Sequence, residues 1–438
     1  MYFGNATSHL KSVSPSLGPL LVQLHRPFNK IIFIGSAVLM WIYGWIYYPI
    51  SQNHGGDFFA VLSGRQVNPG FWDGQGIVYG PVLALYDLAF RGVADLVAMR
   101  VMFILNLTML IIAFMVAVRR FLPAPRSQEE TVAAVFLWIF FYPTFQALRQ
   151  NNVEITELLF LVLMLEALRL RNDWLAGIFL GIAGATKVLP FVLVWYFLWR
   201  CRLRVVAASI LTGSALFYLV IILKGETFGM ALASWWSHAK GDWFSPEFQN
   251  NQAISGLVWR AFSHIELSTR WNIENPLVLD PLAAQTITIG VSLVLFVFVS
   301  FVILRRVGPW PTSTCDQRLE AVEIAIVLIL MLLLLPHNHT HYFILLVWMY
   351  AAALREWPRP AGARGRWVFG LLALSYMLLG LLHMWRLFDP ILHQLGPVTG
   401  VDLARLASLP FFGALAGLVA LLFIHGHLMR GVIQPHSA

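Results

Sequence analysis

Charged residues are scarce in this 438-residue chain: Asp, Glu, Lys and Arg together make up 12%, about half the share found in a typical soluble domain. Hydrophobic residues reach 58%, and apolar runs of roughly 20 residues, long enough to cross a bilayer core of about 30 Å, recur from end to end. This composition excludes a soluble globule and predicts a polytopic membrane protein of the all-α class. The formal net charge of +8 comes from Lys and Arg clusters between apolar runs, which indicates membrane topology rather than nucleic-acid binding.

Cysteine and the common cofactor motifs are almost absent as well. Cys201 and Cys315 are the only cysteines, and both fall in loops predicted to face the cytoplasm, so no disulfide is expected. The sequence has no phosphate-binding P-loop, no nucleotide-binding glycine fingerprint and no Cys/His zinc spacing, so no cofactor is expected. An enzyme of this kind would take an activated substrate other than a soluble nucleotide, and a lipid-linked donor on the outer face fits that absence.

The apolar runs predict about twelve membrane spans in a single transmembrane domain over residues 31–428. Cytoplasmic tails are predicted at 1–30 and 429–438. Segment 51–95 is predicted as a first outer loop with interfacial helices at 58–66 and 80–93, and 224–284 as a long outer loop. The predicted spans are 31–50, 96–118, 130–147, 153–170, 174–186, 188–200, 204–223, 285–304, 320–336, 341–355, 367–386 and 406–428.

The distribution of Lys and Arg predicts the orientation, with both termini in the cytoplasm. The basic clusters at 169–171 and 200–204 both stay inside only if 174–186 and 188–200 form a hairpin. Each arm has about 13 residues and spans roughly 20 Å, which is too short to cross the membrane. The hairpin tip at Thr186-Lys187 is therefore predicted to lie inside the protein, below the outer surface, and Pro190 fits the break in the helix.

A glycine-rich turn with one carboxylate, Asn53-His54-Gly55-Gly56-Asp57-Phe58-Phe59, follows the first apolar run on the predicted outer side. The two glycines leave the backbone unobstructed, so the Asp57 carboxylate could lie close to a ligand and abstract a proton from a sugar hydroxyl. The same carboxylate could instead cap a helix that begins at Phe58. The two roles are compatible.

Lys187 and three alternating histidines lie on the same predicted side. A lone lysine in an apolar stretch either binds a partner such as a lipid phosphate or extends to the membrane surface. His337, His339 and His341 alternate with polar residues directly after a proline. These imidazoles could hydrogen-bond a phosphate or sugar hydroxyls, pack at the interface, or ligate a metal, although the sequence offers no clear matching carboxylate set.

Amide and aromatic side chains also occur in the predicted outer segments. Gln150-Asn151-Asn152 closes a turn between two spans, and Asn251-Gln252 lies in the loop 224–284. Amides both donate and accept hydrogen bonds, so they suit sugar hydroxyls, but Asn-rich turns are also ordinary. The tryptophans of the long loop suit a carbohydrate or lipid headgroup and equally an aromatic belt at the membrane surface.

Six short motifs follow one another between residues 56 and 342. They are Gly56-Asp57-Phe58-Phe59, Tyr79-Gly80-Pro81, Gln150-Asn151-Asn152, 181–190 (GIAGATKVLP), Asn251-Gln252-Ala253-Ile254-Ser255-Gly256, and the histidine run 337–342. In this order they resemble the motifs of bacterial integral-membrane glycosyltransferases of the GT-C fold, specifically glycosyltransferase family 87, which includes polyprenyl-phosphate-mannose-dependent mannosyltransferases. One departure is clear: where related chains tend to show a Trp-Asp-His-His-like run, this chain has Asn338-His339-Thr340-His341.

The resemblance implies a fold, a reaction and a location. It implies inverting transfer of a sugar, with mannose the expected one, from a polyprenyl-phosphate donor to a lipid or glycan acceptor at the periplasmic face of the bacterial inner membrane. Asp57 would deprotonate the acceptor hydroxyl while polyprenyl phosphate departs from the anomeric carbon. Lys187, with His341 first and His339 second, would bind and stabilise the leaving phosphate. Sugar or acceptor binding is assigned to Gln150, Asn151, Asn251, Gln252 and Arg65.

Three other classes of protein remain open at the level of sequence. A membrane transporter commonly has about twelve spans, but one built from inverted repeats should show matching halves, and none is visible here. An enzyme resembling O-antigen ligases or protein glycosyltransferases would share the architecture while using different substrates. A non-catalytic membrane scaffold is the third class.

Overall fold

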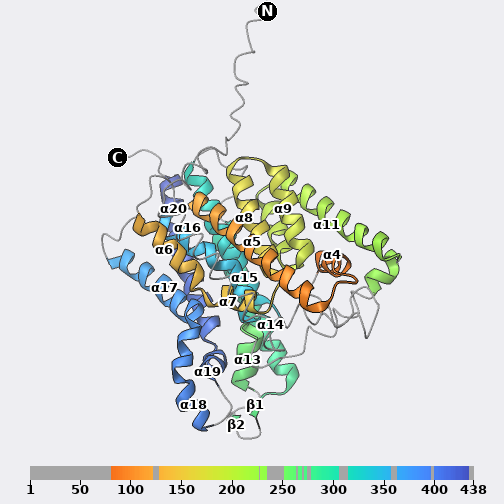
Figure 1. Cartoon of the computed structure of the whole chain (residues 1–438). Coiled ribbons are helices and arrows are strands. Elements are labelled where there is room, and N and C mark those ends of the chain that lie inside the picture. The colour runs from red at the N-terminus through yellow and green to blue at the C-terminus, as the bar shows by residue number, and fades with distance from the viewer. Residues whose placement is uncertain are drawn as a thin grey trace, which may run out of the picture. The chain divides into compact units, whose positions relative to one another are not determined.

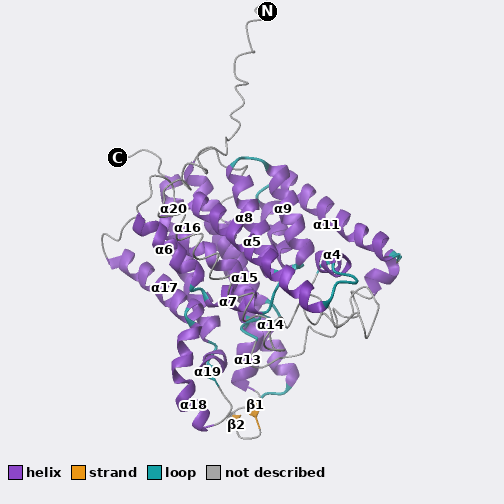
Figure 2. Ribbon diagram, in the orientation of Figure 1, coloured by secondary structure: helices purple, strands orange, loops and turns teal. Residues whose placement is uncertain are grey.

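The structure is a computed structural model, and it describes residues 80–121, 128–225, 227–233, 251–262, 265–268, 271–273, 278–304, 314–356, 363–395 and 399–433. The chain divides into two compact units, Met1–Gln52 and Asn53–Ala438, and every described residue belongs to the second. Helices dominate this part of the chain, with a single pair of short strands, so the all-α prediction is confirmed (Figure 2). Asp57, Arg65 and the interfacial helix predicted at 58–66 lie outside the described residues.

The first half of the described chain consists of helices whose ends are marked by proline, asparagine and glycine (Figure 1). Pro81 lies in the first turn of α4, where a backbone N–H would have no partner within the helix, so the N–H that proline lacks is not missed. The Asn172 side chain caps another helix by accepting from Leu175 N at 3.0 Å, and Gly225, with φ 70°, ends a third. The elements are α4 (Pro81–Ala89), α5 (Asp95–Phe121), α6 (Gln128–Ile139), α7 (Tyr142–Arg149), α8 (Glu154–Arg169), α9 (Asp173–Thr186), the 3-10 helix η1 (Leu189–Phe191), α10 (Val192–Trp199) and α11 (Leu203–Lys224).

The second half adds three helices of more than 20 residues, several shorter ones and the strand pair. The strands β1 (Ile265–Ser268) and β2 (Trp271–Ile273) pair antiparallel within the predicted long outer loop. Thr399 and Asp402 form a reciprocal capping box at the start of a seven-residue helix. The helices are α13 (Ile254–Phe262), α14 (Pro281–Leu304), α15 (Thr314–Leu334), η2 (Thr340–Leu346), α16 (Val347–Glu356), α17 (Ala363–Gly380), η3 (Leu382–Phe388), α18 (Asp389–Leu395), α19 (Gly400–Leu406) and α20 (Leu409–Ile433).

Four described helices are long and apolar enough to cross a membrane, namely α5, α11, α14 and residues 409–429 of α20. A fifth candidate is bent by 62° between Gly365–Gly380 and Leu382–Leu392. Only 17% of the most apolar window of α14 is buried within the protein, and side chains such as Val294 and Phe301 are exposed on it. We therefore take α14 as lipid-facing and the chain as a multi-pass membrane protein. The total of about twelve spans stays a prediction.

Two predicted spans are interrupted in the structure. The predicted span 130–147 is divided, because α6 ends at Ile139 and α7 begins at Tyr142, with Pro143 in its first turn. The predicted span 341–355 starts as the 3-10 helix η2 and becomes α-helical only from Val347. Both interruptions lie beside polar segments that the sequence analysis assigned to the outer side, so straight continuous helices are the wrong description at these two places.

The predicted hairpin is confirmed. Helix α9 ends at Thr186, Lys187 has extended backbone angles, and α10 returns after the short helix η1. The open ends of the two arms meet, because Arg202 Nη1 donates to Asp173 Oδ1 at 2.7 Å. The basic clusters near 169–171 and 200–204 therefore share one end of the structure, and Lys187 lies at the other end of the hairpin.

Glycines allow α9 to pack closely against α11. A Cβ atom at Gly177 would lie 2.4 Å from Val205 O, and one at Gly181 would lie 2.6 Å from Thr212 Cβ. The two glycines are four residues apart and so line one face of α9, which is the small-xxx-small pattern of close helix packing in membranes. Helix α9 also packs along α8, while α20 packs against α15 and α17.

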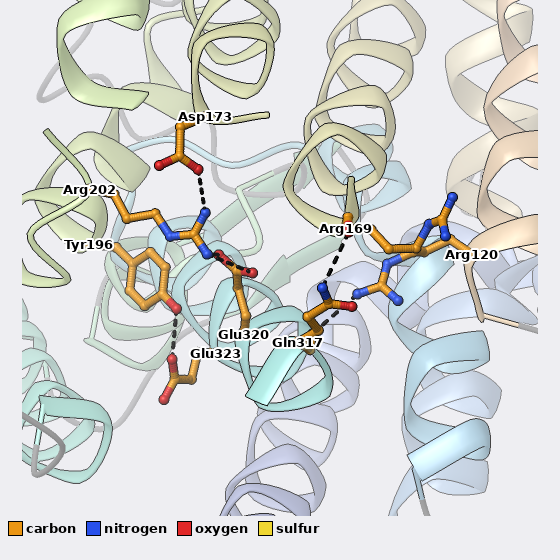
Figure 3. Close-up of polar contacts among 8 residues, drawn as sticks. All are labelled: Arg120, Arg169, Asp173, Tyr196, Arg202, Gln317, Glu320 and Glu323. Atoms are coloured by element: carbon orange, nitrogen blue, oxygen red, sulfur yellow. Dashed lines mark hydrogen bonds and ion pairs between the residues drawn. The ribbon is translucent and has the colours of Figure 1, made fainter. Parts of the chain in front are cut away.

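A buried polar network joins the open end of the hairpin to α15 (Figure 3). Figure 3 shows Arg202 between Asp173 and Glu320, and the Tyr196 hydroxyl donating to Glu323 at 2.7 Å. Arg200 Nη2 also donates to Glu323, at 2.5 Å, and His425 of α20 lies 3.2 Å from the same carboxylate. We call this the hairpin-base network, and it consists of Asp173, Tyr196, Arg200, Arg202, Glu320, Glu323 and His425.

Candidate active site

Lys187, at the hairpin tip, is fully buried. Its side chain has 0% exposure, and its ammonium forms an ion pair with the carboxylate of Glu154. The same Nζ lies 3.4 Å from the centroid of the Tyr342 ring, which is a cation–π geometry. Lysine is rarely buried in this way unless it is paired. The alternative in which Lys187 extends to the membrane surface does not occur in this structure.

Two glutamates from the first turn of α8 lie beside this lysine. Glu154 contacts Lys187 and also lies 3.5 Å from Nε2 of His341. The helix N-terminus favours a negative charge at this position. Glu157, three residues further on, has 0% exposure, and neither of its carboxyl oxygens has a hydrogen-bond partner among the described residues. Neither glutamate was assigned a role from the sequence. The available signal was a pair of carboxylates three residues apart at the start of an apolar run.

The three histidines form a compact group between α15 and η2, which we call the histidine loop (residues 337–341). Nε2 of His337 and Nε2 of His339 are 2.6 Å apart, so one ring donates to the other. The rings of His339 and His341 are stacked, with centroids 5.2 Å apart. His337 and His339 are partly exposed, whereas His341 is buried against Glu154. Within the described residues, no group of three or more His, Cys, Asp and Glu side chains is arranged to hold a metal ion.

The environment of His339 keeps its imidazole neutral at pH 7. Burial lowers the pKa of His339 well below the usual histidine value, and the neighbouring His341, His337 and Lys187 lower it further. A neutral imidazole carries one N–H donor and one acceptor nitrogen, so it can donate a hydrogen bond to an anion without carrying a charge itself. His339 is therefore suited to hydrogen bonding rather than to ion pairing.

Asn251 and Gln252 hold the histidine loop in place. Asn251 Oδ1 accepts from the backbone N–H of Asn338 at 3.1 Å, and its Nδ2 donates to the carbonyl of Pro336 at 2.8 Å. The backbone N–H of Gln252 donates to the carbonyl of Asn338 at 2.6 Å, while its side-chain Nε2 donates to Arg405 O at 3.1 Å. In this structure the two residues therefore anchor the loop, and the sugar contacts assigned to them remain a prediction.

The turn 150–152 places only one of its amides at the surface. Asn151 is buried with a positive φ of 57°, and its Nδ2 donates to Met99 O at 2.9 Å while its Oδ1 accepts from Asn106. Asn152 donates to Gln150 Oε1 at 3.1 Å. Gln150 itself is partly exposed. Asn151 thus fixes the entry into α8, and Gln150 is the member of this turn that a ligand could reach.

Residues distant in the sequence meet around Lys187. The hairpin tip contributes Lys187, α8 contributes Glu154 and Glu157, and the histidine loop with η2 contributes the imidazoles and Tyr342. The start of α4 also reaches this tip, because Gly80 N donates to Thr186 O at 2.9 Å. Asp57 and Arg65 lie outside the described residues. We call the group the Lys187 cluster, and it consists of Glu154, Glu157, Lys187, His339, His341 and Tyr342.

The chemical capacity of the Lys187 cluster is electrostatic. A buried ammonium and adjacent imidazole donors, held in place before any ligand arrives, can stabilise negative charge that develops on a departing group. Low local polarity strengthens such interactions relative to water. Glu154 balances the ammonium and orients it, while Glu157 adds a carboxyl group whose oxygens are not used by the described protein.

Comparisons with known proteins place the chain in a family. Among solved structures, a crystal structure of ArnT from Cupriavidus metallidurans bound to undecaprenyl phosphate is similar at 13% identity, covering 95% of this chain and 78% of that one with a TM-score of 0.43. A likeness this distant says nothing about the ligands of this chain. No curated protein matches the sequence.

The family model for glycosyltransferase family 87 matches residues 78–336, more than half of the chain. The matched range includes the hairpin and the start of α8, and it ends just before the histidine loop. Asp57 lies before its first residue. On the strength of this match, the chain belongs to glycosyltransferase family 87.

Proposed function

We propose that this protein transfers a sugar from a polyprenyl-phosphate donor to a lipid or glycan acceptor, on the outer face of the bacterial inner membrane, with inversion at the anomeric carbon. Family membership supports a glycosyltransferase rather than the transporter or the scaffold. The apolar helices support a membrane-embedded substrate. The sequence also lacks nucleotide-binding motifs, which favours a lipid-linked donor over a soluble nucleotide sugar. Mannose is the sugar that the family resemblance suggests.

The observation that carries the proposal is the convergence of the hairpin tip, the start of α8 and the histidine loop around Lys187. A membrane protein buries such a charged group at high cost, and usually where the group has a function. The leaving group of the proposed reaction is a phosphate monoester on a lipid, whose negative charge grows in the transition state. Lys187, His339 and His341 would stabilise that charge, and His339 is the least buried of the three.

The proposed step balances without a covalent enzyme intermediate. The acceptor hydroxyl attacks the anomeric carbon and forms the new glycosidic bond, while the bond from that carbon to the phosphate oxygen breaks and its electrons leave with polyprenyl phosphate. Asp57 accepts the proton of the hydroxyl as general base. Glu154 is a positioning residue in this scheme, because it contacts both Lys187 and His341.

The test is a transfer assay with the purified full chain in proteoliposomes and radiolabelled polyprenyl-phosphate mannose. Replacement of a general base is expected to lower the rate by about 100- to 10,000-fold, so Asp57→Asn should be almost inactive. Asp73→Asn, which changes another acid of the predicted first outer loop, is the matched control and should keep the wild-type rate. Wild-type activity in Asp57→Asn would remove the proposed base.

The donor class is tested in the same assay. We expect label to be transferred from the polyprenyl-phosphate sugar and not from the corresponding nucleotide sugar, because the chain carries no nucleotide-binding motif. Transfer from the nucleotide sugar in membranes free of polyprenyl phosphate would show that the proposed donor is wrong.

A further inference from the structure

One buried tyrosine lies where three elements that carry arginines pack together. Tyr142, at the start of α7, is 2% exposed and packs with Leu382 of η3 and with Val401 and Ala404 of α19. Arg405 Nη2 donates to its hydroxyl at 3.4 Å. The other two arginines also act electrostatically on this phenol. The set, which we call the Tyr142 arginine cluster, consists of Tyr142, Arg149, Arg386 and Arg405.

The local structure explains why these side chains gather. Arg149 lies seven residues after Tyr142 on α7, two helical turns away, so both project from the same face. Arg386 follows Trp385, which packs against the same apolar group as Tyr142, and Arg405 follows the buried Ala404. The packing of η3 and α19 around Tyr142 therefore brings the segments that carry Arg386 and Arg405 together with α7, although these segments are distant in the sequence.

The charge of this cluster is not balanced by the described residues. Asp402 lies 3.7 Å from Arg405 Nη1, but its carboxylate also accepts from the Thr399 hydroxyl at 2.6 Å as part of a helix cap. No described carboxylate lies within ion-pair distance of Arg149 or Arg386. Arg386 is exposed and Arg149 is partly exposed. The cluster thus has three permanent cations, one carboxylate, and guanidinium groups that a ligand can reach.

The cluster borders the candidate active site along two routes. Gln252 Nε2 donates to Arg405 O at 3.1 Å, and the backbone N–H of the same glutamine donates to Asn338 O within the histidine loop. Arg149 directly precedes the turn 150–152 that leads to Glu154. Helix α7 also packs against η2, which carries His341. A ligand bound at the arginines would therefore lie next to the Lys187 cluster.

We propose that Arg149, Arg386 and Arg405, with the Tyr142 hydroxyl, bind a phosphate group carried by the acceptor. This proposal rests on the proposed function, because only a transferase has an acceptor. The planar guanidinium forks of arginine match the oxygens of a phosphate in bidentate geometry, which lysine cannot do. The donor phosphate is assigned to the Lys187 cluster, so a second cationic site serves a second anion. The acceptor is accordingly an anionic, phosphate-bearing lipid.

The first arm of the test measures lipid binding and requires no turnover. The full chain is placed in nanodiscs of phosphatidylcholine and phosphatidylglycerol, and native mass spectrometry counts the lipids that remain bound. Wild type should retain the anionic lipid preferentially, and Arg149→Gln/Arg386→Gln should lower that preference by roughly tenfold or more, because each basic residue near an anionic lipid strengthens its binding. Arg204→Gln, a single exposed arginine at the hairpin-base end, is the control and should lower the preference far less than the double variant.

The second arm identifies the source of the phosphate. A membrane lipid extract is separated by anion exchange into neutral and anionic fractions, and each is offered as acceptor with radiolabelled polyprenyl-phosphate mannose. Label should enter the anionic fraction. The double variant should need roughly tenfold more of that fraction for half-maximal rate, with an unchanged maximal rate. Arg405→Lys, which keeps the charge and loses the fork, should show a smaller shift of the same kind.

Each outcome decides a separate point. Equal retention of both lipids by wild type, or a double variant that behaves as wild type in both arms, overturns the site. Label that enters neutral lipids alone overturns the acceptor assignment, even if the arginines bind phosphatidylglycerol. If wild type transfers no label from any polyprenyl-phosphate sugar, the proposed function fails, and the retention arm alone decides whether the cluster binds phosphate.

Discussion

Two clusters of buried charge lie at opposite ends of the same helices and are built differently. The hairpin-base network pairs each of its carboxylates with a guanidinium, as Glu323 does with Arg200 at 2.5 Å. The Lys187 cluster contains two carboxylates and one permanent cation, and Glu157 has no hydrogen-bond partner among the described residues. Helix α8, 16 residues or roughly 24 Å long, begins at the Lys187 cluster, and its last carbonyl accepts from Gln317, one turn before Glu320 of the other network.

The difference indicates what each cluster is for. A network in which every carboxylate has a guanidinium partner holds elements together, and the hairpin-base network joins α9, α10, α15 and α20 in this way. A buried group whose hydrogen bonds are incomplete is tolerated mainly where function requires it. Besides Glu157, the Thr340 hydroxyl and Oδ1 of Asn338 are also buried without a partner among the described residues. All three lie in or beside the proposed site, whereas Oε1 of Glu320 in the hairpin-base network, although it has no hydrogen bond among the described residues, lies 3.2 Å from a guanidinium nitrogen of Arg202.

The largest expected effect comes from breaking the hairpin-base network. Glu323→Ala removes the acceptor shared by Tyr196, Arg200 and His425 and leaves a buried guanidinium uncompensated. The free energy of unfolding should fall by about 3–5 kcal/mol, measured as a lower yield of folded protein and a lower melting temperature in detergent. Transfer activity per folded molecule should not change.

A double variant shows whether the pair serves stability alone. Arg200→Met/Glu323→Leu replaces both charges by apolar groups of similar size, which is often neutral or stabilising for a buried ion pair. We expect the melting temperature to return to the wild-type value together with full activity. Full stability without activity would mean that this end of the hairpin contributes to the reaction, and the contrast between the two clusters would be wrong.

The second effect separates stability from activity at the Lys187 cluster. Lys187→Met alone leaves Glu154 buried without its cation, whereas Lys187→Met/Glu154→Gln removes both charges together. The double variant should therefore melt near the wild-type temperature, yet its transfer rate should be lower by about 100-fold or more, as for the loss of a donor that stabilises developing charge. The melting temperature is measured by intrinsic fluorescence and the transfer rate by label transfer, both on one preparation of each variant. Wild-type activity in the double variant would remove Lys187 from the mechanism.

Local pattern was sufficient to predict the all-α fold, the hairpin and its tip. The arms 174–186 and 188–200 are defined by Pro190 and by the basic residues beside them, and these signals act over a few residues. The interruption of the span 130–147 was missed, although Pro143 marks it. Apolar aromatic residues on both sides of the break keep the mean hydropathy of the segment high. Boundaries that depend on such short signals are the least certain part of a sequence-based prediction.

The partners of buried charges could not be predicted, because they are set by tertiary packing. Arg200 and Arg202 belong to a basic cluster that the sequence assigns to cytoplasmic topology, yet the structure buries both against glutamates of α15. Lys187 and Glu154 are 33 residues apart, and no spacing rule connects them. Asn251 and Gln252 were chosen as sugar ligands by residue type; in the structure the Asn251 side chain fixes the histidine loop, and the Gln252 side chain donates to Arg405 O.

The smallest expected effect is a pH dependence of stability that originates at His339. Burial lowers the pKa of His339 well below the value near 6.5 of the unfolded chain, and His341, His337 and Lys187 lower it further. As pH falls below about 6.5, the unfolded state takes up a proton that the folded state does not, so the free energy of unfolding decreases by up to about 1.4 kcal/mol per pH unit. The melting temperature of wild type should therefore fall between pH 7 and pH 5, and His339→Gln should flatten that fall. His427→Gln, at an exposed position of α20, should leave the slope unchanged. An unchanged slope in His339→Gln would show that its imidazole titrates normally, and that the Lys187 cluster is more open to water than the hairpin-base network.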